Sequence, residues 1–162
     1  MNIARIKRKT WPRKNLGEVC NFLDKVYPGG YSLQDLARDF DTSPQAVSNW
    51  FRRDDMTLAH AEEIGRIYGY SLTLYFPTRN FNDGYIPGEP TRKFNNAGNL
   101  TGLIKYIQDS EWSIAFVAEQ TGVANQTLTR AFEKGNIRLS TLNKIVDGLG
   151  LVIQWEYKKT KQ

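Results

Sequence analysis

The two halves of the chain carry the same pattern of apolar residues, displaced by a constant 81 positions. Matched pairs, each differing by 81 in residue number, include Tyr31 with Trp112, Val47 with Leu128, Phe51 with Phe132, Leu58 with Leu139 and Ile64 with Ile145. The offset holds without a gap from Val19 to Gly69 in the first copy. Two unrelated helical patterns would drift out of register over that length. The sequence therefore predicts a duplicated fold.

Each copy is expected to contain four helices. The first, over 14–26 and 99–109, has apolar residues at i, i+3, i+4 and i+7. The second begins after Ser32 or Ser113, both good N-caps. A tight turn at 41–42 or 121–122 leads to the third helix, which in the first copy has Ser43 as its cap and Pro44 at its first position. The fourth is predicted over 58–68 and 139–149.

A strand is predicted at the end of each copy. Residues 70–76 and 151–157 alternate between apolar and polar side chains, which is typical of a strand with one buried face. A lone strand leaves backbone groups and an apolar face uncovered. We therefore expect the two strands to pair within the chain as an antiparallel ribbon. The predicted fold is mainly α-helical, with two tandem domains that form a pseudo-dimer.

The composition divides the chain into four segments. Residues 1–13 form a basic N-terminal arm, and residues 14–77 the first domain with its strand. Residues 78–98, rich in Pro, Gly and Asn, read as a linker. Residues 99–162 form the second domain with its strand and a basic tail. The first fifteen residues hold six Lys or Arg and no acidic residue, which fits an arm that follows a DNA backbone.

The second and third helices of each copy have the features of a helix-turn-helix. Ala37 and Ala118 stand where the helices cross, and Val47 and Leu128 anchor the third helix from beneath. The exposed polar positions of the third helices are then candidates for reading base edges in the major groove. They are Gln45, Ser48, Asn49, Asn125, Gln126, Thr129 and Arg130. Candidate phosphate contacts are Arg5, Lys7, Arg8 and Lys9 in the arm, and Arg52, Arg53, Lys134 and Arg138 just past the reading helices.

The segments "LARDFDTSPQAVSNWFRR" and "VAEQTGVANQTLTRAFEKGN" resemble the Xre/Cro-type helix-turn-helix family. They are most similar to its antitoxin and phage-regulator branch, in which a strand follows the helical domain. The resemblance covers about 14–77 and 99–158, and it implies third helices that enter the major groove of operators. The first copy departs from the family pattern, because Asp41-Thr42 stands where a glycine is customary in the turn.

The remaining composition argues against several classes of protein. The single Cys20 and single His60 are expected to be structural, and they cannot supply a tetrahedral zinc site. We see no catalytic constellation and no phosphate-cradling glycine loop, so we expect neither an enzyme nor a cofactor. No membrane span is expected, and a cytoplasmic, nucleoid-associated location is predicted. Asp54-Asp55 is interpreted as a pair of solvated helix-end charges.

Two functions remain open at this stage. The first is a DNA-binding transcription regulator, expected to be a repressor that acts as a monomeric pseudo-dimer on double-stranded DNA, with further dimerisation left open. Because the two reading helices differ, its site is expected to be asymmetric, with half-sites about one DNA turn, roughly 34 Å, apart. The alternative is an antitoxin-like module in which one copy binds DNA and the other binds a protein partner, such as a toxin or a transcription component. An apolar groove that is exposed on one copy only would favour this alternative function.

Overall fold

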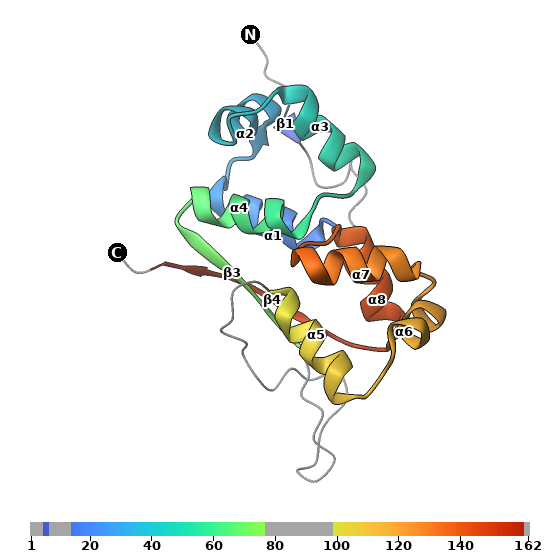
Figure 1. Cartoon of the computed structure of the whole chain (residues 1–162). Coiled ribbons are helices and arrows are strands. Elements are labelled where there is room, and N and C mark those ends of the chain that lie inside the picture. Colours follow the sequence, from blue (N-terminus) through green and yellow to red (C-terminus); the bar gives the residue numbers. More distant parts are fainter. Residues whose placement is uncertain (1–4, 7–13, 77–98, 161–162) are drawn as a thin grey trace.

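The computed structural model describes residues 5–6, 14–76 and 99–160, and within these ranges the chain forms eight helices and four strands (Figure 1). The first copy contains α1 (Gly17–Val26), α2 (Leu33–Asp39), α3 (Pro44–Arg53), α4 (Leu58–Ile67) and β3 (Tyr70–Tyr75). The second contains α5 (Leu100–Asp109), α6 (Ile114–Thr121), α7 (Asn125–Lys134), α8 (Leu139–Gly148) and β4 (Gln154–Lys159). Two short strands, β1 (Arg5–Ile6) and β2 (Tyr31–Ser32), precede α2. The mainly α-helical fold with a terminal pair of strands is confirmed.

Three serines start helices where the sequence placed them. Ser32 accepts a hydrogen bond from the Asp35 N–H at 3.0 Å, and Asp35 in turn accepts from the Ser32 N–H, so the two residues form a capping box. Ser43 accepts from the Ala46 N–H at 3.1 Å. Ser113 accepts from the Phe116 N–H at 3.0 Å. These bonds satisfy N–H groups that have no partner within their own helix.

The turn between the second and third helices has the same left-handed conformation in both copies. Gly122 has φ of 74°, and its counterpart Asp41 has φ of 53°. Aspartate is among the few non-glycine residues that tolerate this region. The turn therefore forms in the first copy without the customary glycine.

The ribbon of β3 and β4 relates the two copies to each other. The strands pair antiparallel, with Tyr70 opposite Lys159 at one end and Tyr75 opposite Gln154 at the other. Leu74 lies opposite Trp155, and these two residues differ by the repeat offset of 81. Two counterparts that face each other are related by a local two-fold axis that passes between them. The ribbon thus places an approximate two-fold axis between Leu74 and Trp155.

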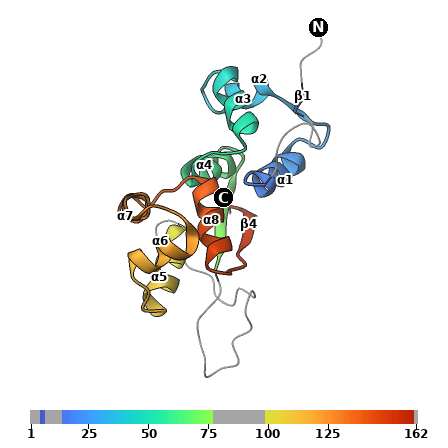
Figure 2. The ribbon, with the colours of Figure 1, turned by 90° about the vertical axis from the view of Figure 1, so that its right-hand side faces the viewer.

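A second contact lies on the same kind of axis, at an isolated antiparallel bridge between Thr57 and Arg138. These residues again differ by 81. The Leu58 N–H donates to the Ile137 carbonyl at 2.7 Å, and the Leu139 N–H donates to the Met56 carbonyl at 2.8 Å. The two hydrogen bonds are equivalent under the repeat, because the donors Leu58 and Leu139 differ by 81 in residue number, and so do the acceptors Met56 and Ile137. The loops before α4 and α8 therefore form a symmetric junction at the centre of the molecule (Figure 2).

Side chains reinforce this junction by capping helices across it. Asp55 accepts from both the backbone N–H and the hydroxyl of Ser140, at 3.0 and 2.7 Å, at the start of α8. Its counterpart Asn136 accepts from the Ala59 N–H at 3.0 Å, at the start of α4. Each copy thus caps the fourth helix of the other.

The interpretation of Asp54-Asp55 as solvated charges was wrong. Asp54 is 7% exposed and accepts from the backbone N–H groups of Asn15 and Leu16, at 2.9 and 3.1 Å. Asp55 is engaged with the second copy, as described above. Both carboxylates accept from helix starts that are distant in sequence, so local charge pattern alone could not reveal their partners.

The second strand begins three residues later than predicted, at Gln154 rather than Leu151, and extends to Lys159. The reason is the register. Because Gln154 lies opposite Tyr75, the residues before it would need partners beyond the end of β3. Leu151 is nevertheless buried and Ile153 packs against the core, so the alternation predicted burial but not pairing.

Tyr157 joins β4 to the helices of the first copy. Its ring stacks on Phe22 of α1 with centroids 4.0 Å apart, and its hydroxyl donates to the Ala61 carbonyl of α4 at 2.9 Å. Burial raises the pKa of this hydroxyl above its usual range. The two copies therefore share one core, because the strand of the second packs into the helices of the first.

Candidate nucleic-acid interface

Helix α7 presents the more open of the two candidate reading faces. Asn125, Gln126, Thr129 and Arg130 are all exposed, while Leu128 is fully buried beneath them. Amide, hydroxyl and guanidinium groups on one exposed helix face are the groups that can bond to base edges. The structure thus places the four predicted residues together on one surface.

On helix α3 the candidate reading side chains are less exposed than on α7, and some of them bond to one another. Gln45 is exposed, whereas Ser48 and Asn49 are half-buried. The Asn49 amide oxygen accepts from Gln45 Nε2 at 3.3 Å and also from the Arg52 guanidinium. These three side chains form one network along the helix, so a base that bonds to Asn49 would have to share or replace these bonds.

The predicted phosphate contacts fall into three groups. Arg52 and Arg53 are exposed in the last turn of α3, and Lys134 is exposed at the end of α7. Arg138 is also exposed, but its guanidinium lies 3.7 Å from the Asp55 carboxylate at the junction between the copies. Arg138 therefore stands close to the approximate two-fold axis as well as to α7.

The remaining candidates lie in the N-terminal arm. Lys7, Arg8 and Lys9 are outside the described residues. Arg5 belongs to β1, whose backbone pairs antiparallel with Tyr31–Ser32 directly before α2. β1 is thereby held beside the helix-turn-helix of the first copy.

A basic hollow of about 220 Å³ lies between α7 and α8. Its lining includes Thr127, Arg130, Lys134, Arg138 and Thr141. The hollow brings together one predicted base-reading residue and two predicted phosphate contacts. Clustered cations of this kind suit a phosphate group.

The corresponding place in the first copy is filled by aromatic side chains. Trp50 stands where the second copy has Ala131, and His60 where it has Thr141. The ring centroids of Trp50 and His60 lie 5.2 Å apart, and the Phe40 ring contacts Trp50 edge-on with centroids 5.1 Å apart. Sequence reasoning missed this difference, although the alignment of Trp50 with Ala131 carries the signal.

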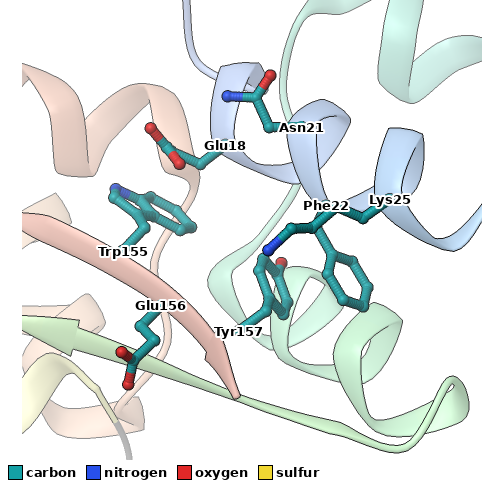
Figure 3. Close-up of a pocket in the computed structure, with 7 residues that line it drawn as sticks. All are labelled: Glu18, Asn21, Phe22, Lys25, Trp155, Glu156 and Tyr157. Atoms are coloured by element: carbon teal, nitrogen blue, oxygen red, sulfur yellow. The ribbon is translucent and has the colours of Figure 1, made fainter. Parts of the chain in front are cut away.

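Away from α3 and α7, two adjoining hollows open between α1 and β4, and Figure 3 shows the residues that line the first of them. The first, of about 230 Å³, is lined by Glu18, Asn21 and Lys25 of α1 and by Trp155 of β4, among others. The second, of about 440 Å³, continues from Glu18 and Trp155 towards Val152 and α8. Together we call them the α1–β4 groove.

Other kinds of site find no support in the described parts of the chain. No group of three or more His, Cys, Asp or Glu side chains there could hold a metal ion. None of the helices in those parts has the length and apolar character needed to cross a bilayer. The single cysteine, Cys20, is buried.

Comparison with known proteins links part of the chain to a phage regulator. Over 83 residues, the chain is 44% identical to Repressor protein CI of Enterobacteria phage phi80. The match covers 51% of this chain but 28% of the phage protein, so the chain spans less than a third of that relative's length. No family model matches the sequence, and no solved structure matches it significantly.

Proposed function

We propose that this protein is a transcription regulator of repressor type that binds double-stranded DNA through α3 and α7. The observation that carries the proposal is the exposed face of α7, where Asn125, Gln126, Thr129 and Arg130 surround a fully buried Leu128. The similarity of half the chain to a phage repressor supports the same function. An enzymatic role is not part of the proposal.

In this proposal the chain acts as a covalent pseudo-dimer. The two-fold junction at Thr57 and Arg138 and the ribbon pair of Leu74 and Trp155 support an arrangement like that of two subunits on an operator. The reading helices would then enter successive major grooves, roughly 34 Å apart. Since α3 and α7 differ at two aligned reading positions, Ser48 against Thr129 and Asn49 against Arg130, the preferred site would be asymmetric.

The two copies would contribute differently to binding. The hollow beside α7 is lined by Arg130, Lys134 and Arg138, and we assign it a DNA phosphate. Its counterpart beside α3 is occupied by Trp50 and His60. Of these two places, only the one in the second copy would therefore bind a phosphate and add salt-dependent affinity.

Selection of random duplex DNA by the full-length protein, followed by sequencing of the bound pool, tests the proposal. Two unlike half-sites about one helical turn apart are expected. Absence of any enriched sequence would contradict sequence-specific binding, and a single short half-site would show that one copy alone reads DNA.

Two substitutions separate base reading from phosphate binding at α7. Arg130→Ala should relax the preference at one position of the second half-site, at a cost of about 1–3 kcal/mol. Lys134→Gln should weaken binding evenly across sequences and reduce the salt dependence by about one phosphate contact. Lys105→Gln on α5, where Lys105 pairs with Asp109 at 3.6 Å, serves as the charge-matched control.

The alternative function, an antitoxin-like module with a protein partner, is favoured by one feature. The α1–β4 groove is open on one side of the ribbon, where Val152 is 55% exposed and Trp155 is half-buried. The counterpart of Trp155, Leu74, is 1% exposed. If the DNA selection gives a single half-site, this groove becomes the first place to seek a protein partner.

A further inference from the structure

The side chain of Asn99, at the start of α5, bonds to the outer edge of β3. The Leu74 N–H donates to Asn99 Oδ1 at 3.1 Å, and Asn99 Nδ2 donates to the Leu72 carbonyl at 3.0 Å. The same Nδ2 donates to Glu62 at 3.0 Å. A carboxamide presents one donor and one acceptor side by side, as a peptide group does. Asn99 thus gives β3 the bonds that a neighbouring strand would give.

The register shows which backbone groups of β4 face outward. In an antiparallel pair, opposite residues alternate between those bonded to each other and those turned away from each other. Leu72 and Leu74 turn their backbone groups towards Asn99 and therefore away from β4. Their partners, Tyr157 and Trp155, consequently direct their own N–H and C=O groups to the outer edge of β4.

At the repeat position equivalent to Asn99, the first copy has Glu18. A carboxylate accepts hydrogen bonds but cannot donate one to a strand carbonyl. Among the described residues, no hydrogen bond beyond the ribbon pairing reaches the backbone of Trp155. Within the part of the chain that the structure describes, the edge that Asn99 closes on β3 is therefore open on β4.

The open edge lies in the α1–β4 groove (Figure 3). Trp155 and Glu18 line both of its hollows, and the exposed Val152 extends its apolar floor. Along the α1 wall the charge alternates, with Glu18 near Trp155 and Lys25 two turns further along the helix. The groove therefore combines unpaired strand backbone, apolar floor and a fixed order of charges.

We propose that the outer edge of β4 binds an extended segment of a partner protein, which adds to the ribbon as a third strand. Backbone pairing would satisfy the outward groups of Trp155 and Tyr157. Glu18 and Lys25 are about 10 Å apart along the helix. The segment is accordingly expected to carry a basic and an acidic side chain on one face, about two to four residues apart.

A single strand fits this edge better than a second folded copy. Two-fold pairing of β4 with β4 would place both α1 helices on the same face of the sheet, each beneath the strand of the other copy. Adjacent strands are about 4.8 Å apart, whereas packed helices need about 8–10 Å. The α1 helix therefore leaves room for a strand but not for its own symmetry mate.

A library of random 12-residue peptides displayed on phage, selected against the full-length protein, tests the proposal. The key variant is Glu18→Asn, which installs the side chain that closes the other edge. Enriched peptides are expected to alternate in polarity, to carry the two charges described above, and to bind the variant about tenfold more weakly. Glu119→Asn, the same change at an exposed position on α6, should leave their binding unchanged.

Two further measurements make the test independent of the peptide found. N-methylation along one edge of an enriched peptide should abolish binding, and along the other edge should not, because a strand pairs through one edge. Amide exchange at Trp155 should be faster than at Leu74 in the free protein and should slow in the Glu18→Asn variant, which also shows that the variant is folded.

Several results would overturn the proposal. They are a library without enrichment, peptides that bind the Glu18→Asn variant equally well, and peptides that tolerate N-methylation on both edges. Dimers of the free protein that dissociate on the same substitution would identify a second copy as the occupant instead. None of these outcomes depends on DNA binding.

Discussion

At the residue scale, one carboxylate ties three helices of the first copy together. Asp39 at the end of α2 accepts from the hydroxyl of Tyr27, directly after α1, at 2.5 Å and from the hydroxyl of Tyr68, directly after α4, at 2.8 Å. Arg38 donates to the same carboxylate at 3.3 Å. Burial works to raise the pKa of Asp39, but the hydrogen bonds from the two tyrosines and from Arg38 outweigh it and lower that pKa below its usual value.

This lowered pKa predicts a specific acid dependence of stability. The contribution of Asp39 to folding is fully present above the unfolded-state pKa, about 3.9, and is lost as the pH falls through the lower native pKa. In the Asp39→Asn variant, the free energy of unfolding should therefore fall less steeply below about pH 4 than in the wild type. Urea denaturation at a series of pH values measures this, with Asp147→Asn on α8, an exposed position, as the control. If the free energy of unfolding fell equally steeply with decreasing pH in the Asp39→Asn variant and in the wild type, the assignment would be refuted.

Gly65 of α4 is a second residue whose role depends on a long-range contact. A Cβ added there would lie 2.9 Å from two ring carbons of Tyr157 and 3.2 Å from the Tyr70 carbonyl. The Tyr157 ring is held by Phe22 and cannot easily move aside. Gly65→Ala should therefore destabilise the fold by about 1–3 kcal/mol despite alanine's better helix propensity.

Thermal denaturation checks this expectation, and Gly17→Ala is its matched control. A Cβ at Gly17 has no atom within 4 Å, so the same substitution there should leave stability unchanged or raise it. Equal melting temperatures for the two variants would show that Tyr157 does not pack against α4 as described.

At the element scale, the fourth helices of the two copies are unusual in being capped from the opposite copy. Asp55 caps α8 with two hydrogen bonds and also pairs with Arg138, whereas Asn136 caps α4 with one. A carboxylate at a helix N-terminus also interacts favourably with the helix dipole, which a neutral amide does less strongly. The two symmetric caps should therefore differ in strength.

Alanine substitution of each cap tests this difference. Asp55→Ala should lower the free energy of unfolding by about 1–2 kcal/mol, and Asn136→Ala by less. Chemical denaturation of both variants measures the two losses under the same conditions. A larger loss for Asn136→Ala would mean that the charge on Asp55 contributes little to the junction.

At the scale of the whole molecule, a nearly symmetric scaffold carries two dissimilar surfaces. The junction and the ribbon follow the repeat offset, while two aligned candidate reading positions differ between α3 and α7, and a third, Gln45 with Gln126, is identical. Ser48 corresponds to Thr129, and Asn49 to Arg130. In the proposed function, this divergence sets the asymmetry of the DNA site.

Making the two reading faces alike should make the preferred site more symmetric. The double substitution Thr129→Ser with Arg130→Asn gives α7 the residues of α3 at two reading positions, while the buried anchors stay unchanged. Selection of random duplex DNA by this variant should yield half-sites more similar to each other than those of the wild type. An unchanged second half-site would mean that these two positions do not read bases.

The sequence by itself predicted the helices and, through Ser32, Ser43 and Ser113, the starts of α2, α3 and α6. The first helix begins at Gly17 rather than at the predicted residue 14. Serine caps, apolar spacing and strand alternation act over a few neighbouring residues, so they can be read directly from the chain. The buried anchors Val47 and Leu128 and the pairing of β3 with β4 were predicted on these grounds and confirmed. The candidate base-reading residues were placed by the same local logic and stay predictions.

The sequence predicted that the two strands pair, but only the tertiary structure decided their register and the other contacts between the copies. The register of the ribbon, the caps from Asp55 and Asn136, and the open edge at Trp155 all join residues far apart in sequence. Such contacts depend on the relative placement of whole elements, which local patterns do not encode. The difference between Asn99 and Glu18 shows this most clearly, because the two are equivalent in the repeat, yet their effect on the edges of the ribbon follows from the fold alone.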